Sequence, residues 1–147
     1  MSQLRDLSFK EFSELYYSGK IEPETETIEV TQEMNNTFMR LSRSTCPVHT
    51  DDEFAKSLGY ERTISYGLMY EVLAVNCSEM LTGKNVIGYQ WNVSFRKPVF
   101  VGDKLTVKCE AIRIVKSTRN VIEKITVTNA ETGEVKSDII VKCKFLK

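Results

Sequence analysis

The densest group of potentially reactive side chains lies between residues 41 and 51, in the segment Leu-Ser-Arg-Ser-Thr-Cys-Pro-Val-His-Thr-Asp. His49 in this segment is the only imidazole of the chain. It follows Pro47 and shortly precedes a predicted helix, so we expect it in a turn. Imidazole is the side chain that most readily exchanges a proton near neutral pH. His49 is therefore a candidate acid–base residue, and a surface or capping histidine without a chemical task is the alternative.

A second candidate is the turn Ile64-Ser65-Tyr66-Gly67, which leads into a predicted helix. Backbone N–H groups at a helix N-terminus are unpaired, and glycine lets a ligand come close to the backbone. Such a helix start can hold a carbonyl oxygen while negative charge develops on it. Gly67 is therefore a candidate oxyanion donor, and an ordinary helix start is the alternative.

The helix after this turn is predicted to be the centre of the fold. Residues 67–81 contain no proline and are followed by Gly83, a typical C-cap residue. Their apolar side chains cover most of the circumference, which is typical of a buried helix. These apolar residues are Leu68, Met69, Val72, Leu73, Val75, Met80 and Leu81.

Two shorter helices are predicted upstream of the central one. Thr31 is the expected N-cap of a helix over 32–41, in which Leu41 is expected to face the core. A third helix is expected over 51–58, with Thr50 as its N-cap.

The second half of the chain alternates apolar and polar residues, as half-buried strands do. The apolar phase slips near Ala111, which predicts a β-bulge. Short connections between the strands indicate an antiparallel meander. The expected strands cover about 87–95, 105–114, 121–127 and 135–145, with one more over 26–30.

An antiparallel sheet wrapped around one long central helix is a hot-dog arrangement. We therefore predict an α+β hot-dog fold in a single domain over residues 1–147. One such unit leaves a sheet edge exposed, so we expect two copies to pair as a homodimer.

Composition excludes several classes of function. The chain has 20 basic and 20 acidic side chains, so it lacks the basic excess that is typical of nucleic-acid binding. The sequence shows no signal peptide and no apolar stretch long enough to span a bilayer, so we expect a cytoplasmic protein without a membrane partner. The four cysteines are scattered, so we expect no metal site.

Several short motifs occur in an order that is similar to that of a known family. They are Pro-x-His-x-Asp over 47–51, Tyr-Gly-Leu-Met over 66–69 and Phe-Arg-Lys-Pro-Val-Phe-Val-Gly-Asp over 95–103. In these motifs the chain resembles the MaoC-like hot-dog dehydratases, which include the (R)-specific enoyl-CoA hydratases. The resemblance extends over about residues 20–147.

The resemblance implies a reaction. The family hydrates trans-2-enoyl thioesters or carries out the reverse dehydration, with an aspartate and a histidine that handle water and the proton at the α-carbon. The expected partner is an acyl-CoA or acyl-carrier-protein substrate. Coenzyme A or phosphopantetheine arrives as part of that substrate, so no separate cofactor is expected. The active unit of the family is a dimer or a tandem pair.

The family's site residues match this chain only in part. His49 corresponds to the catalytic histidine and Gly67 to the oxyanion glycine, but Ser44 occupies the position of the aspartate. Cys46 replaces the asparagine of the motif, and Tyr66 replaces the histidine that precedes the helix glycine. Ser44, His49 and Gly67 are thus the candidate catalytic residues, and Cys46 and Tyr66 the candidate substrate-binding ones. A serine hydroxyl cannot act as a base unaided, because its pKa is far too high.

Several alternatives follow from the missing carboxylate. Glu71, on the predicted central helix, could face His49 and supply an acid, so it joins the candidate substrate-binding residues. A thioesterase that uses Glu71 and water is one alternative function. Cys46 could act as a nucleophile if His49 lowered its pKa. A protein that binds acyl thioesters without chemistry is the remaining alternative.

Overall fold

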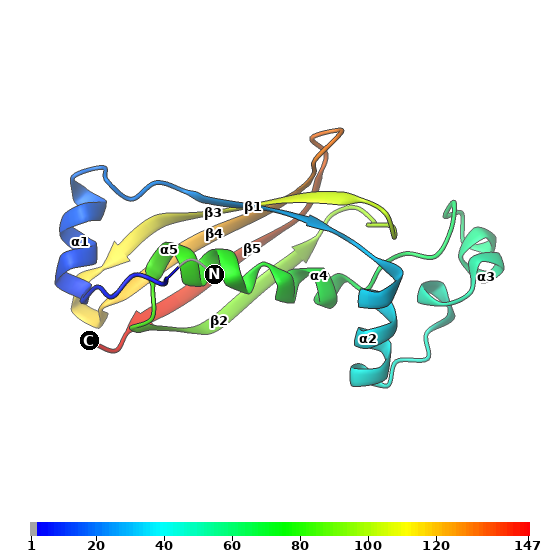
Figure 1. Cartoon of the computed structure of the whole chain (residues 1–147), viewed down its shortest axis with the longest axis horizontal. Helices are drawn as coiled ribbons and strands as arrows, with labels where there is room; N and C mark the ends of the chain where they lie inside the picture. Colours follow the sequence, from blue (N-terminus) through cyan, green and yellow to red (C-terminus); the bar gives the residue numbers. More distant parts are fainter. Residues whose placement is uncertain (1–2) are drawn as a thin grey trace.

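The computed structural model describes residues 3–147 and contains a five-stranded antiparallel sheet (Figure 1). Helices α4 and α5 follow one another along one face of the sheet, while α1 lies at one end of the molecule and α2 and α3 at the other. The predicted α+β hot-dog architecture is confirmed. The predicted domain begins at residue 1, and residues 1 and 2 lie outside the described range.

The elements follow one another in the order helix, strand, helices, strands. The strand order in the sheet is β1-β3-β4-β5-β2. The helices are α1 (Phe9–Tyr17), α2 (Gln32–Ser42), the 3-10 turn η1 (Pro47–His49), α3 (Asp52–Ser57), α4 (Gly67–Leu73), α5 (Val75–Thr82) and the 3-10 turn η2 (Lys116–Thr118). The strands are β1 (Glu24–Glu29), β2 (Val86–Phe95), β3 (Lys104–Val115), β4 (Asn120–Asn129) and β5 (Val135–Phe145).

The inner faces of β3, β4 and β5 form the centre of the core. Their alternating side chains point toward α4 and α5, and each inward apolar residue is almost fully buried. The predicted bulge is confirmed, since the β3–β4 register shifts between Ala111 and Arg113. The buried residues on these faces include Leu105, Val107, Cys109, Val121, Ile125, Val127, Ile139, Val141 and Cys143.

Strand β2 is the main difference from the predicted meander. It pairs with β5 and not with β3, so it forms one edge of the sheet. The connection over residues 96–103 leads the chain from this edge to β3, past two intervening strands. A register shift between Gly88 and Gln90 interrupts the pairing, and Ile87, Tyr89 and Phe95 are about half exposed. An unpaired edge explains why the predicted apolar face of this strand is only partly covered.

The predicted central helix is divided at Ala74. Its N–H donates to the carbonyl of Glu71 at 2.9 Å, a three-residue bond that tightens the helix between α4 and α5. The prediction that the helix is buried all round is wrong, because Leu68 is 59% and Val72 62% exposed. The predicted cap Gly83 ends α5 with a φ of 91°.

The two short helices agree with the sequence in position and differ in detail. Thr31 caps α2 as predicted, accepting the Met34 N–H at 3.2 Å. Leu41, expected in the core, is 82% exposed at the outer face of the last turn. The N-cap of α3 is Asp51 and not Thr50, because it is the Asp51 carboxylate that accepts the Phe54 N–H, at 3.1 Å.

Helix α1 is an element that periodicity did not predict. A capping box starts it: the Ser8 hydroxyl accepts the Glu11 N–H, and the Glu11 carboxylate accepts the Ser8 N–H. Phe12 is fully buried against Phe145 of β5. Within residues 3–147 no helix has the length and apolar character that crossing a membrane requires.

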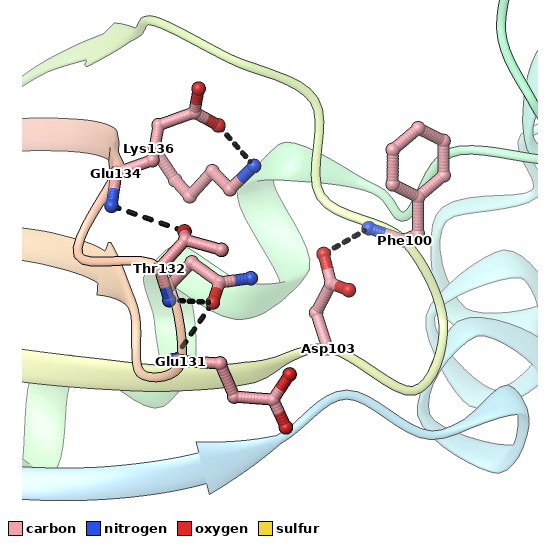
Figure 2. A network of polar contacts seen from close by, with 7 residues as sticks. Phe100, Asp103, Glu131, Thr132, Glu134 and Lys136 are labelled. Carbon is pink, nitrogen blue, oxygen red and sulfur yellow. Dashed lines mark hydrogen bonds and ion pairs between the residues drawn. The ribbon is translucent and has the colours of Figure 1, made fainter.

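The loop after β2 is held in one shape by backbone bonds. The Asp103 carboxylate accepts the backbone N–H of Phe100 at 2.9 Å (Figure 2), and Gly102 adopts a φ of 93° that suits glycine. The Val99 carbonyl accepts the Ser65 N–H at 2.7 Å. The loop therefore fixes the segment that leads into α4.

Candidate functional site

A pocket of about 460 Å³ opens where η1, the segment before α4 and the loop after β2 meet. Its walls are mainly aromatic and apolar, with His49 and a few polar groups among them. The described lining residues are Phe38, His49, Tyr60, Ile64, Ser65, Tyr66, Gly67, Leu68, Tyr70, Phe95, Arg96, Lys97, Pro98 and Val99. Among these residues there is no carboxylate.

His49 is held in one orientation at the wall of this pocket. Its Nδ1 lies 2.8 Å from the Ile64 carbonyl oxygen, which can only accept, so Nδ1 carries the proton. The Ile64 N–H in turn donates to the Val48 carbonyl at 3.1 Å. In the neutral imidazole Nε2 is then the free basic atom. The predicted turn around His49 thus presents a proton acceptor to the pocket.

Tyr66 packs directly on His49. The two ring centroids are 4.1 Å apart with an angle of 31° between the rings, and Phe38 of α2 packs on Tyr66 at 5.0 Å. Tyr66 is only 5% exposed, and its hydroxyl has no hydrogen-bond partner among the described residues. Tyr66 therefore lies at the pocket in contact with His49.

Gly67 begins α4, and its first-turn N–H has no acceptor within the helix. A Cβ at residue 67 would lie 2.5 Å from the ring of Phe95, far inside van der Waals contact. The absence of a Cβ at residue 67 thus leaves room for the half-exposed Phe95 ring in its present position. Gly67 lines the same pocket as His49, as an oxyanion donor must.

Ser44 and Cys46 lie apart from this arrangement. Neither is among the described residues that line the pocket, and Cys46 is exposed. Ser44 is half-buried, and its backbone N–H donates to the Ser42 hydroxyl at 3.3 Å. The structure therefore brings together His49, Tyr66 and Gly67 of the predicted residues, without Ser44 and Cys46.

Glu71 is buried and faces the sheet. It is 4% exposed, and the Ser137 hydroxyl of β5 donates to its carboxyl group. Burial raises the pKa of Glu71 to about 7, and the nearby Asp138 acts in the same direction. The structure does not place Glu71 with His49 in the pocket lining, so it does not supply the carboxylate there.

The rim of the pocket carries two basic side chains. Arg96 and Lys97 follow β2, and their backbone N–H groups donate to the Lys136 carbonyl at 2.8 and 3.1 Å. The Arg96 guanidinium also bonds Asp138 at 2.9 Å. Figure 2 shows Lys136 paired with Glu134 at the neighbouring turn. The rim thus offers positive charge close to the pocket opening.

The pocket has aromatic wall residues that were missed from the sequence. Tyr70 and Phe95 form one wall of the pocket. Their aromatic side chains did not indicate a site in the sequence, because helices and strands contain many aromatic residues that only pack in the core. The lining residue Ser65 forms a buried hydrogen bond of 2.9 Å with Asn35 of α2, which is not itself among the described lining residues. A polar residue on the inner face of α2 was the available signal for Asn35.

The comparisons with known proteins identify the family. The family model described as "MaoC like domain" matches residues 19–135, most of the chain. The chain belongs to the MaoC-like domain family. It is also 36% identical, over 74 residues, to an (R)-specific enoyl-CoA hydratase from Aeromonas caviae. That alignment covers 50% of this chain and spans about half of the relative, 55% of its length.

Two solved structures of R-hydratases share the fold. The (R)-hydratase from A. caviae involved in PHA biosynthesis superposes with a TM-score of 0.78 at 23% identity, over 84% of this chain and 94% of that one. An unliganded R-hydratase from Pseudomonas aeruginosa gives a TM-score of 0.79 at 20% identity, over 98% of this chain and 88% of that one. The hot-dog fold of this MaoC-like chain is therefore shared with two R-hydratases.

Proposed function

We propose that this protein binds acyl thioesters and hydrates trans-2-enoyl thioesters, with His49 as the proton-transfer group. The observation that carries the proposal is the orientation of His49 beside the start of α4. Its Nδ1–H is fixed by the Ile64 carbonyl at 2.8 Å, and Gly67 lines the same pocket. A base and an oxyanion donor on one pocket are the parts that this reaction needs. The family membership and the A. caviae relative support the same chemistry.

The proposed reaction proceeds through these two groups. His49 Nε2 accepts a proton from water as the water oxygen bonds to C3 of the enoyl group. The electron pair of the C2–C3 double bond moves toward the thioester oxygen, which the Gly67 N–H holds. The imidazolium then returns its proton to C2, which gives the 3-hydroxyacyl thioester. Coenzyme A or phosphopantetheine takes part only as the carrier, and we expect the basic side chains of Arg96 and Lys97 in the pocket lining to contact its phosphate groups.

The absence of a carboxylate among the described lining residues sets an expectation for the rate. One missing proton-transfer partner typically costs about 10²–10⁴ in rate. We therefore expect slow hydration. The same observation favours the second candidate function, an acyl-thioester binding protein without turnover.

The test is a hydration assay with crotonyl-CoA and a longer enoyl-CoA, followed by the loss of the conjugated enoyl absorbance. The native protein is expected to turn over, and His49→Gln to lose that turnover while its circular dichroism is unchanged. Thr50→Ala is the matched control, because Thr50 is an exposed neighbour of His49 outside the described lining. Equal turnover in the native protein and His49→Gln would reject the catalytic role. If neither the native protein nor any variant hydrates the esters but the native protein still binds them, the binding function is favoured.

A homodimer is the proposed assembly. The apolar side chains of Leu68 and Val72 are exposed on α4, and β2 offers an unpaired edge with Ile87 and Tyr89 about half exposed. Edges and apolar helix faces of this kind are usually covered by a second copy or another protein. The exposed face of α4 begins at the pocket, because Leu68 also lines it.

A further inference from the structure

Aromatic side chains are far more frequent around the pocket than in the chain as a whole. Five of its 14 described lining residues are phenylalanine or tyrosine, whereas aromatic residues make up 10% of the chain. They come from α2, the loop after α3, the start of α4 and β2, so no single helix or strand pattern explains why they meet here. We call them the aromatic lining: Phe38, Tyr60, Tyr66, Tyr70 and Phe95. None of these rings takes part in the proton transfer proposed for His49.

Two accessible rings of the aromatic lining are held in place by buried ones. Phe38 is partly buried and packs on Tyr66, with 5.0 Å between the ring centroids. Phe95 is 51% exposed and packs edge-to-face with Tyr70, with 6.2 Å between the centroids and 84° between the rings. Tyr66 and Tyr70 are only 5% and 3% exposed. The rings that can touch a ligand are therefore fixed before it arrives, which lowers the cost of ordering them on binding.

Phe95 also lies at the start of α4, where the thioester oxygen is proposed to bind. Its ring comes so close to Gly67 that a Cβ there would be 2.5 Å from a ring carbon. Although this side chain is large and apolar, about half of its surface is open. Removing such apolar surface from water is favourable, and a ligand in the pocket can cover it. Phe95 is thus positioned to contact the part of the acyl group that lies next to the reacting carbons.

The chemistry of the aromatic lining defines the ligand that fits it. Aromatic rings attract one another in stacked or edge-to-face pairs with centroids about 4.5–7 Å apart, and such pairs contribute beyond the area they bury. A cavity of about 150 Å³ holds a benzene molecule. The pocket of about 460 Å³ therefore has room for one further ring together with an enoyl group. A ring conjugated to the C2–C3 double bond is also rigid, whereas an alkyl chain loses rotational freedom on binding.

We propose that the pocket selects enoyl thioesters that carry an aromatic ring at C3, the arylacryloyl type, over alkyl ones, with Phe95 as a specificity-determining residue. The inference rests on the proposed function, since it takes the ligand to be an enoyl thioester. Buried area alone predicts the opposite order, because a saturated group with the same number of carbons has at least as much apolar surface as one with a phenyl ring. A preference for the ring therefore distinguishes the proposal from unspecific hydrophobic binding.

The test measures binding and does not depend on turnover. The probes are 3-phenylpropanoyl-CoA, 3-cyclohexylpropanoyl-CoA and nonanoyl-CoA, whose acyl groups have equal numbers of carbon atoms. All three are saturated at C2–C3 and cannot be hydrated, so titration calorimetry reports their Kd alone. We expect 3-phenylpropanoyl-CoA to bind about fivefold or more tightly than either of the others. The imidazole signals of His49, the only histidine, report by NMR that each ester occupies this pocket.

Three variants locate the preference at Phe95. Phe95→Leu removes the half-exposed ring and is expected to reduce the preference to about twofold or less. Phe95→Tyr keeps a ring at the same place and should retain the preference. Tyr17→Leu is the matched control, because it also removes an exposed ring, on α1 at the other end of the molecule from α2 and α3 (Figure 1), and should keep the native ratio. Circular dichroism checks that all three variants fold.

The outcomes separate the inference from the proposed function. If the native protein binds the phenyl ester no more tightly than the two saturated ones, or binds crotonyl-CoA and none of the three, the inference is overturned and the proposed function stands. If it binds neither crotonyl-CoA nor any of the three, both are overturned. A preference that Phe95→Leu keeps in full would also reject the inference, because the ring would then not be held against Phe95.

Discussion

The ring of Tyr66 lies over the imidazole of His49, with 4.1 Å between the ring centroids. Together with the Ile64 carbonyl, this contact fixes both the tilt of the imidazole and the position of its protons. An aromatic ring this close shifts the NMR signals of the imidazole protons through its ring current. We expect Tyr66→Leu to move the two carbon-bound His49 signals toward the values of a free histidine. Tyr66→Phe is the control and should keep them close to the native values. Unchanged signals in Tyr66→Leu would contradict the observed stacking.

The close approach of β2 to the start of α4 predicts the effect of Gly67→Ala. The added Cβ would lie 2.5 Å from the Phe95 ring, so this half-exposed ring must turn away from its present position. We expect a loss of about 1–3 kcal/mol of unfolding free energy, the usual cost of overpacking. Urea denaturation measures it.

A second substitution tests the cause of that loss. Phe95→Leu removes the ring that the new methyl group meets, so the double variant Gly67→Ala, Phe95→Leu should lose less than the two single changes predict together. Strict additivity would mean that the clash is not the source of the destabilisation.

The buried carboxyl of Glu123 predicts a pH-dependent stability. This residue of β4 is fully buried, receives a hydrogen bond from Ser78 at 2.5 Å, and has one oxygen without a partner among the described residues. Burial raises its pKa from 4.5 to about 7. The folded state therefore favours the protonated acid. The stabilisation is fully present below pH 4.5 and is lost as the pH rises through about 7.

Glu123→Gln isolates this contribution. A glutamine cannot ionise, so the Tm of the variant minus the native Tm should increase between about pH 5 and pH 8. Glu131→Gln is the control, because Glu131 is exposed at the turn between β4 and β5. The thermal scans are run at several pH values for all three proteins. A difference that stays constant with pH would show that Glu123 does not titrate in this range.

The exposed face of α4 predicts which substitution prevents the proposed dimer from forming. Leu68 and Val72 are one turn apart on this helix and are 59% and 62% exposed. Val72→Lys would place a charge in an apolar interface without disturbing the core of one copy. Sedimentation velocity is expected to show a dimer for the native protein and a monomer for the variant. Lys56→Glu, on the exposed side of α3, is the control. A native monomer at all concentrations would reject the dimer.

The sequence predicted most of the scaffold because its strands and helices carry strong periodic patterns. The bulge at Ala111 and the cap at Thr31 were predicted correctly, since each depends on residues close together in the chain. Strand β2 was assigned to the wrong neighbour, because alternation defines a strand but not its partner. Helix α1 was missed because its core contact, Phe12 with Phe145, spans nearly the whole chain.

The candidate site was predictable only in its family-like part. His49 and Gly67 were identified from residue type and motif, and they do line one pocket. Ser44 was assigned from the family's motif, and it is not among the described residues that line the pocket. Asn35 was missed because a single polar residue on a helix is usually exposed, and only the folded structure shows that it is buried.

The pocket is assembled from segments that are far apart in the chain. Its walls come from α2, η1, the start of α4 and the loop after β2, and that loop is held against Val30 and Ser65. Each of these contacts joins residues that are far apart in the chain, and forming such long-range contacts slows folding. The ligand-binding surface is therefore expected to form late, after the sheet has paired. A folding intermediate with a complete β3–β4–β5 core would still be unable to hold a substrate.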